Sequence, residues 1–376
     1  MSAPKPAPTP SSTPLEERLL SLIADNGPMS IGDFMADALS HQQHGYYTTQ
    51  DPFGQEGDFT TAPEISQLFG ELVGAWLVDA WQTIGSPSHF NLVELGPGRG
   101  TLMADILRVG KVRPAFLDAA KIFMVENSGR LRVRQQRGLE GVHPSISWVD
   151  ALEAVPHAPT LLVANEFFDC LPIRQFVRTA DTGDTPWRER LVGRDEKAGA
   201  PRLCFTLSET KYAHRKGMPP NAEPESTFEE CAAGIEVISA LASRFEQHKG
   251  RALIIDYGHG RAAYGDTFQA VKRHDYWYPL ASPGLADVTA HVDFSALSRA
   301  GREANARVDG PVQQGPFLDR LGLKPRLDAI CAGASANVQA ELTAGAERLA
   351  SPEGMGELFK VMALSSASLP EPPGFS

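Results

Sequence analysis

The segment that most restricts the fold is residues 91–101 (NLVELGPGRGT), where an apolar run meets three glycines at every second position. Residues 90–95 are predicted to be a buried parallel strand, because a short continuous apolar run bounded by glycine is typical of one. A helix with an apolar stripe follows, formed by Leu102, Met103, Ile106 and Leu107. Glycine has no side chain, so the backbone can turn sharply and a ligand can approach it closely. A strand, a glycine loop and a helix in this order indicate a nucleotide-cofactor site.

The spacing of the glycines separates two classes of cofactor. Dinucleotide-binding enzymes carry G-x-G-x-x-G and, further on, an acidic residue that binds the ribose. Thr101 stands where the third glycine of that pattern would be, which counts against a nicotinamide-dependent oxidoreductase. The pattern here is E-x-G-x-G-x-G, formed by Glu94, Gly96, Gly98 and Gly100. It resembles the first motif of class I S-adenosyl-L-methionine (SAM) methyltransferases.

Strands and helices alternate beyond the glycine loop. Further strands are predicted at residues 121–126, 145–149, 160–164 and 252–256. This alternation predicts an α/β fold with a parallel, doubly wound sheet whose ligand lies beyond the carboxyl ends of the strands. Carboxylates stand at or just beyond these ends, namely Glu94, Glu126, Asp150, Glu166 and Asp256. A local role such as a helix cap explains any one of them, but their repetition at one edge favours a shared crevice.

The remaining segments divide the chain into parts. Residues 1–14 are rich in Pro, Ser, Ala and Thr, and we expect a disordered leader there. Residues 15–88 are expected to be a helical region that ends in a long helix at 64–84. The cofactor-binding core is then formed by residues 89–174 and 250–376. It includes a helix at 292–302 and a final strand at 359–364.

Residues 175–249 are expected to be a β-rich insertion in that core. Three segments with turns between them are predicted to be antiparallel strands, at 175–179, 187–193 and 202–207. A helix at 229–247 then returns the chain to the fifth strand of the core.

Composition excludes several functions. The formal net charge of −11, from 35 basic and 46 acidic side chains, argues against a dedicated nucleic-acid binder. Four separated cysteines without a C-x-x-C pair indicate reduced thiols and give no zinc signature, and we expect no metal. No apolar run approaches the roughly 20 residues that span a membrane. Because residues 1–14 lack the features of a signal or transit peptide, we expect a cytoplasmic location.

Four stretches together resemble the MidA-like SAM-dependent methyltransferases, whose mitochondrial members are complex I assembly factors. They are residues 57–70 (GDFTTAPEISQLFG), 94–103 (ELGPGRGTLM), 165–172 (NEFFDCLP) and 265–294, which ends in DVTAHVDF. One departure lies after Glu126, where this family leads us to expect a Ser-Pro-like turn and the chain has Asn127, Ser128 and Gly129. The resemblance covers nearly the whole chain from about residue 15. It implies a class I fold with seven strands, one of them antiparallel, and SAM as the cofactor. For the mitochondrial relatives it also implies methylation of an arginine on a complex I subunit, so we expect a protein substrate.

The resemblance also implies which residues hold SAM. Gly96, Gly98 and Gly100 would bring backbone N–H groups against the amino-acid part of SAM, and Glu94 would help to hold its ammonium group. Glu126 would accept hydrogen bonds from the ribose hydroxyls, and Asp150 would lie near the adenine amino group. Thr61 and Pro63 precede the helix expected at Glu64, whose N-terminus can bind a carboxylate; an ordinary helix cap is the equal alternative.

Candidate catalytic residues follow the fourth strand, where substrate-facing residues of this fold class lie. They are Asn165, Glu166 and Asp169. Arginine stays protonated in proteins, so a carboxylate can orient its guanidinium and draw charge onto the attacking nitrogen. Our hypothesis is that Glu166 is this clamp and Asp169 its helper. His259 and His291 are alternative general bases, although a structural role is the simpler explanation for each.

Other functions stay open at this point. The chain could be a non-catalytic SAM-binding docking factor for assembly, or a methyltransferase of small molecules. The sequence determines neither the oligomeric state nor the identity of the acceptor.

Overall fold

The computed structural model describes residues 12–50, 58, 60–180, 183–196 and 200–376. The chain divides into two compact units, each assembled from three separate segments. Unit 1 consists of Met1–Phe59, Asp169–Gly234 and Arg261–Asp293, and unit 2 consists of Thr60–Phe168, Ile235–Gly260 and Phe294–Ser376. Most of the expected leader lies outside the described residues. The first helix, α1 (Pro14–Asn26), begins where the leader was expected to end, with Thr13 as its N-cap.

The main sheet has eight strands, of which seven, all in unit 2, follow the order β15-β16-β10-β5-β2-β3-β4, while the two-residue strand β14 (Val292–Asp293) pairs with β10 off this path. The seven strands are β2 (Phe90–Leu95), β3 (Ala120–Val125), β4 (Ile146–Val149), β5 (Thr160–Asn165), β10 (Gly250–His259), β15 (Arg307–Gln313) and β16 (Phe359–Ser365). Strand β16 pairs antiparallel with β10 and with β15, and the other neighbours are parallel. The predicted α/β fold is confirmed: the seven strands of this order include one antiparallel strand, β16, as expected, and the short β14 is an addition.

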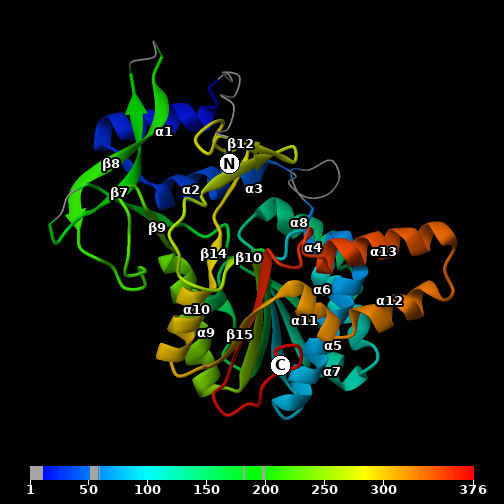
Figure 1. The fold of residues 1–376 in the computed structure, drawn as a ribbon. Helices are drawn as coiled ribbons and strands as arrows, with labels where there is room; N and C mark the ends of the chain where they lie inside the picture. Colours follow the sequence, from blue (N-terminus) through cyan, green and yellow to red (C-terminus); the bar gives the residue numbers. More distant parts are fainter. Residues whose placement is uncertain (1–11, 51–57, 59, 181–182, 197–199) are drawn as a thin grey trace. The chain divides into compact units, whose positions relative to one another are not determined.

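Helices cover both faces of this sheet (Figure 1). On one side lie α9 (Ala232–Gln247) and α10 (Phe294–Glu303), and on the other lie α5 (Gln67–Thr83) and α6 (Thr101–Gly110). The main hydrophobic core joins α5 and α6 to the sheet and includes Trp76, Ile106, Leu92 and Val163. Every residue of β2 and β5 is buried, which explains why their sequences are continuous apolar runs rather than alternating ones.

Further helices complete unit 2. They are α4 (Ala62–Ile65), α7 (Pro114–Ala119), α8 (Gly129–Gly138), α11 (Gln314–Arg320), α12 (Leu323–Cys331) and α13 (Ala336–Ala350). The prediction of a single helix at 64–84 is wrong, because the helix is interrupted at Ser66, between α4 and α5. Ser66 is extended there (φ −157°, ψ 133°), and its hydroxyl accepts a hydrogen bond from the N–H of Leu68 to cap α5.

Unit 1 packs helices against β-sheets. Its helices are α1, α2 (Ile31–Ser40) and α3 (Tyr46–Thr49). One sheet has the order β1-β7-β6-β9, with β8 paired to β7, and contains β1 (Met29–Ser30), β6 (Arg174–Arg178), β7 (Trp187–Asp195), β8 (Arg202–Tyr212) and β9 (Thr227–Glu230). A second sheet contains β11 (Gln269–Lys272), β12 (Asp275–Trp277) and β13 (Asp287–Thr289). The three antiparallel strands expected within 175–249 are confirmed as β6, β7 and β8, and β9 is an addition to them.

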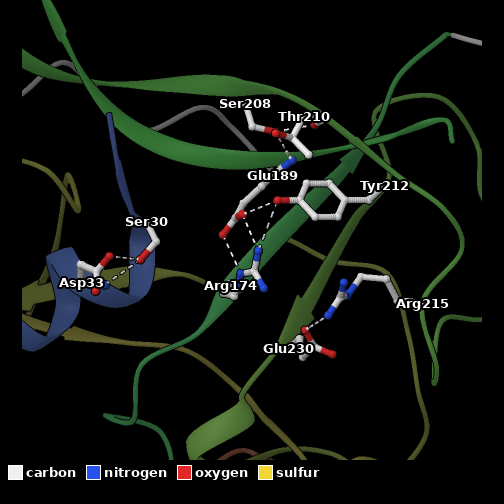
Figure 2. A network of polar contacts seen from close by, with 9 residues as sticks. All are labelled: Ser30, Asp33, Arg174, Glu189, Ser208, Thr210, Tyr212, Arg215 and Glu230. Carbon is white, nitrogen blue, oxygen red and sulfur yellow. Dashed lines mark hydrogen bonds and ion pairs between the residues drawn. The ribbon is translucent and has the colours of Figure 1, made fainter. Parts of the chain in front are cut away.

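A polar network joins three strands of unit 1 (Figure 2). Arg174 on β6 forms two hydrogen bonds with Glu189 on β7, at 2.7 Å and 2.5 Å, and the hydroxyl of Tyr212 on β8 donates to the same carboxylate at 3.2 Å. Nearby, Arg215 pairs with Glu230 at 2.7 Å. Two-pronged arginine–carboxylate contacts fix strand register as well as adding stability, so this network is structural.

Candidate functional site

The glycine loop lies between β2 and α6, at the carboxyl edge of the unit 2 sheet. Gly96, Gly98 and Gly100 all have positive φ angles of 61°, 52° and 82°. A Cβ atom at Gly96 would lie 2.9 Å from Cδ2 of Phe167, closer than real Cβ contacts. The N–H of Gly96 donates to the carbonyl of Val125 at 3.1 Å, which ties the loop to β3. The backbone path and the packing of Phe167 therefore both require glycine at position 96.

Glu94 is the fifth residue of β2 and lies two residues before Gly96 in the chain. Its side chain is only 3% exposed, and burial raises its pKa well above the ordinary value, an effect that a hydrogen bond from the backbone N–H of Met103 partly offsets. Within the described part of the chain, its Oε2 has no hydrogen-bond partner. A buried acceptor of this kind is costly unless a ligand satisfies it, so it suits a cationic donor such as an ammonium group.

Glu126 follows β3 and is also buried. Its Oε1 accepts from the N–H of Ser128 at 2.8 Å, and its Oε2 accepts from Nε2 of Gln135 at 3.1 Å. Burial raises the pKa of Glu126, and these two hydrogen bonds partly offset the rise. In place of the expected Ser-Pro-like turn, the hydroxyl of Ser128 caps α8 by accepting from Leu131. The turn thus holds Glu126 at the strand end in a fixed orientation.

Asp150 follows β4, but its environment differs from that of the other carboxylates. Its side chain is 84% exposed, and it pairs with Nη2 of Arg132 on α8 at 2.6 Å. The Nε of the same arginine donates to the carbonyl of Glu126 at 2.6 Å. Asp150 therefore steadies the turn after β3 through Arg132, and its contact with adenine stays a prediction.

Thr61 and Pro63 belong to the short helix α4, where Thr61 is the N-cap and Pro63 is buried. The hydroxyl of Thr61 makes no cap hydrogen bond. Instead, the N–H of Ala62 donates to Oε1 of Glu166 at 3.1 Å. Part of the family motif at residues 57–70 lies outside the described residues, and this contact ties the start of α4 to the end of β5.

Asn165 is the last residue of β5, and Glu166 follows it directly. Glu166 has a φ of 53°, an uncommon conformation for a residue with a side chain and one that clusters at functional sites. Its Oε1 also accepts from Nδ2 of Asn165 at 3.0 Å. Because the carboxylate can only accept, the amide nitrogen of Asn165 must face it, and Oδ1 points elsewhere. That oxygen is buried and has no hydrogen-bond partner among the described residues.

The turn after β5 is held by Asp256 on β10, which is fully buried. Its Oδ2 accepts from the N–H groups of Phe167 and Phe168 at 3.1 Å and 2.9 Å, and its Oδ1 accepts from Tyr257 at 2.9 Å. This carboxylate orders the backbone on which Phe167 packs over Gly96. Its role is therefore to shape the loop.

The remaining candidates lie elsewhere. Asp169 is the first residue of the second segment of unit 1 and is buried, and its carbonyl accepts from the N–H of Ala290 at 2.9 Å. His259 is the last residue of β10 in unit 2. His291, in unit 1, donates its backbone N–H to the hydroxyl of Thr267 at 2.9 Å.

One residue of the site, Gln135 on α8, was missed by sequence reasoning. It is fully buried and contacts both the glycine loop and Glu126. The sequence does contain a signal for this residue. A glutamine stands on the apolar face of the predicted helix, four residues after Leu131 and four before Leu139.

These residues fit SAM. Its ammonium group matches the buried Oε2 of Glu94, its ribose hydroxyls match the acceptor-only carboxylate of Glu126, and the glycine loop leaves space for close approach of the backbone. Among the described residues, no cluster of three or more His, Cys, Asp and Glu side chains is suited to a metal ion, and the helices include none able to cross a membrane.

Two named proteins are similar to this chain over nearly its whole length. Protein arginine methyltransferase NDUFAF7 homolog, mitochondrial, from Drosophila melanogaster is 38% identical, with 97% of this chain and 89% of the relative covered. Protein arginine methyltransferase NDUFAF7, mitochondrial, from Homo sapiens is 35% identical, with 96% and 86% covered.

The names of these relatives overturn the expected cytoplasmic location, since both are mitochondrial. The error has a physical reason, because neither the composition of residues 1–14 nor unpaired cysteines identify a single compartment. Reduced thiols indicate a reducing environment, and more than one compartment provides one.

The fold and the cofactor are supported by a solved structure and a family model. A crystal structure from Burkholderia thailandensis, of a "likely methyl transferase" bound to S-adenosyl-homocysteine, has a TM-score of 0.81 at 28% identity and covers 97% of both chains. The family model described as "Putative S-adenosyl-L-methionine-dependent methyltransferase" matches residues 72–312. The α/β fold, the E-x-G-x-G-x-G loop and these similarities agree, and the chain belongs to this family of SAM-dependent methyltransferases.

Proposed function

We propose that the chain methylates an arginine side chain on a protein substrate. The observation that carries the proposal is the similarity, over at least 96% of the chain, to proteins that are named protein arginine methyltransferases. The net charge of −11 also suits an arginine-bearing, basic segment as the partner. Following the family resemblance, we propose a respiratory complex I subunit as the specific acceptor.

The residues at the end of β5 offer suitable chemistry. SAM, when bound, supplies a methyl group on a positively charged sulfur, and the enzyme's task is to align a nitrogen with it in a dry site. Asn165 Oδ1 is a buried acceptor, so it favours a nucleophile that carries N–H groups over a carboxylate or an ether oxygen. We propose that Asn165 orients the guanidinium and that Glu166 supplies the charge that stabilises it. The new bond joins the methyl carbon to the nitrogen, the carbon–sulfur bond breaks, and the nitrogen's proton passes to a carboxylate.

The experiment follows transfer of a labelled methyl group from SAM into protein of a cell extract, with hydrolysis to identify the methylated amino acid. We expect label in methylarginine. Glu166→Gln keeps an oxygen that can accept from Ala62 and Asn165 but removes the charge, so we expect transfer to fall by about 100-fold or more while binding of S-adenosyl-homocysteine changes little. Asp169→Asn tests the second predicted carboxylate in the same assay.

Other outcomes would redirect the proposal. Label in a residue other than arginine would contradict the acceptor and leave the methyltransferase intact. If S-adenosyl-homocysteine binds but no protein is labelled, a docking role or a small-molecule acceptor gains support. Full activity of Glu166→Gln would remove Glu166 from the chemistry and assign it to holding α4 against β5.

A further inference from the structure

The side chain of Gln135 connects the two halves of the cofactor site. Its Nε2 donates to the carbonyl of Gly98 in the glycine loop at 2.8 Å and to Oε2 of Glu126 at 3.1 Å. Its Oε1 accepts from Nε1 of Trp148 on β4 at 2.8 Å. Each partner permits only one orientation of the amide, since a carbonyl and a carboxylate need a donor and an indole N–H needs an acceptor. Gln135 is therefore fixed by three independent contacts.

Packing adds to these hydrogen bonds. Gln135 is fully buried, and its Cγ lies 3.5 Å from where a Cβ at Gly100 would be. The side chain thus bonds to the loop at Gly98 and lies over the side of Gly100 where a side chain would project. A neutral amide is suited to this place, because a cation would compete for Glu126 and a carboxylate would face both Glu126 and the carbonyl of Gly98.

We infer that Gln135 is a positioning residue that sets the glycine loop and Glu126 in one arrangement before the cofactor arrives. The inference rests on the proposed roles of the loop and of Glu126 in holding SAM. By this inference α8 contributes to the affinity for SAM. A single side chain of that helix connects the glycine loop, which would hold the amino-acid part of SAM, to Glu126, which would bind its ribose. Preorganisation of this kind raises affinity by removing the cost of ordering the site on binding.

The first test is calorimetric titration with S-adenosyl-homocysteine, which involves no acceptor protein. Gln135→Met is close in size and has neither amide donor nor amide acceptor. We expect its affinity to fall about 10- to 100-fold, because two of the three hydrogen bonds that it loses reach the cofactor site and one of these two involves a charged group. Trp148→Phe is the matched control, because it removes the third partner alone, and we expect a change of less than about 3-fold.

A second comparison separates positioning from general stability. If Gln135 acts through Glu126, the losses from Glu126→Gln and Gln135→Met are less than additive in the double variant. If the losses of affinity are additive and parallel a lowered melting temperature, Gln135 has only a structural role and the inference is overturned. Wild-type affinity in Gln135→Met would also overturn it.

A pH profile keeps the inference testable if Gln135→Met does not fold. In Gln135→Glu the new carboxyl still accepts from Trp148, but when ionised it repels Glu126 and cannot donate to Gly98. Protonation restores the donor, so we expect affinity for S-adenosyl-homocysteine to recover at least about 5-fold between about pH 8 and about pH 5.5, with a smaller change in the wild type. A variant that binds with wild-type affinity across this range would contradict the inference. Failure of the wild type to bind S-adenosyl-homocysteine would instead remove the cofactor site itself, and failure to label arginine would affect only the proposed acceptor.

Discussion

At the scale of single residues, Glu94 and Glu71 are two buried carboxyls of unit 2 with opposite electrostatics. Burial raises the pKa of Glu94 well above its ordinary value of 4.5. For Glu71, burial acts in the same direction, but hydrogen bonds and charge from Arg326 and Arg108, at 2.7 Å and 2.8 Å, lower its pKa overall. The folded state thus retains the Glu94 proton to higher pH than the unfolded state does, and releases the Glu71 proton at lower pH.

These directions predict opposite effects of removing each charge. A carboxyl with a raised pKa opposes folding increasingly as the pH rises above about 4.5. We therefore expect Glu94→Gln to raise the melting temperature of the ligand-free protein by about 2–4 °C near pH 7.5, with little effect near pH 4.5. Glu71→Gln should lower it near pH 7.5, since its stabilisation is present above about 4.5 and is lost as the pH falls.

Ligand binding separates the two residues further. If Glu94 meets the ammonium group of SAM, Glu94→Gln weakens binding of S-adenosyl-homocysteine by about 10-fold or more in calorimetry, whereas Glu71→Gln leaves it nearly unchanged. If Glu94→Gln melts at a lower temperature than the wild type at pH 7.5 and binds S-adenosyl-homocysteine with wild-type affinity, the carboxylate stabilises the fold and does not bind the cofactor.

At the scale of elements, what the sequence can predict depends on how local the cause is. The buried strands β2 and β5 were predicted to within one residue, because their own apolar runs determine them. Strand β15 contains Gly310 and Pro311, which do not favour a strand by themselves. Its extended conformation is stabilised by pairing with β16, and this pairing is irregular between Asp309 and Val312. Such pairing is tertiary and leaves no local pattern. Likewise, Gln135 acquires its role only because α8 packs beside the glycine loop.

The glycine loop itself permits a matched test. Gly96 and Gly141 have similar φ angles of 61° and 71°, but a Cβ at Gly141 meets nothing within 4 Å, whereas one at Gly96 lies 2.9 Å from Phe167. Both Gly→Ala changes should cost about 1–2 kcal/mol of backbone strain. Only Gly96→Ala should also displace Phe167 and reduce affinity for S-adenosyl-homocysteine by about 10-fold or more, as measured by calorimetry. Equal affinity in the two variants would mean that the loop tolerates a side chain facing Phe167.

At the scale of the whole molecule, the chain passes repeatedly between the two units. Three segments of unit 1 alternate with three of unit 2, which gives five crossings, at 59/60, 168/169, 234/235, 260/261 and 293/294. Two segments of unit 1 therefore have both ends joined covalently to unit 2. While unit 2 is folded, it holds the two ends of each such segment at a fixed separation. When unit 2 unfolds, that constraint is lost, and the folding of unit 1 alone must then offset the entropic cost of closing these chain loops. We infer that global opening of unit 1 is coupled to that of unit 2.

This coupling predicts how the ligand acts on a strand outside its own unit. S-adenosyl-homocysteine at 100 times its dissociation constant stabilises the folded state by about 2.7 kcal/mol, or about 100-fold. We expect the slowest-exchanging amides of β7 in unit 1 to slow by nearly the same factor as those of β2 in unit 2, in hydrogen exchange followed by mass spectrometry. Glu126→Ala, with weakened binding, is the control and should show little slowing in either strand. If β2 slows and β7 retains its rate, the units open independently, and the five crossings act only as tethers.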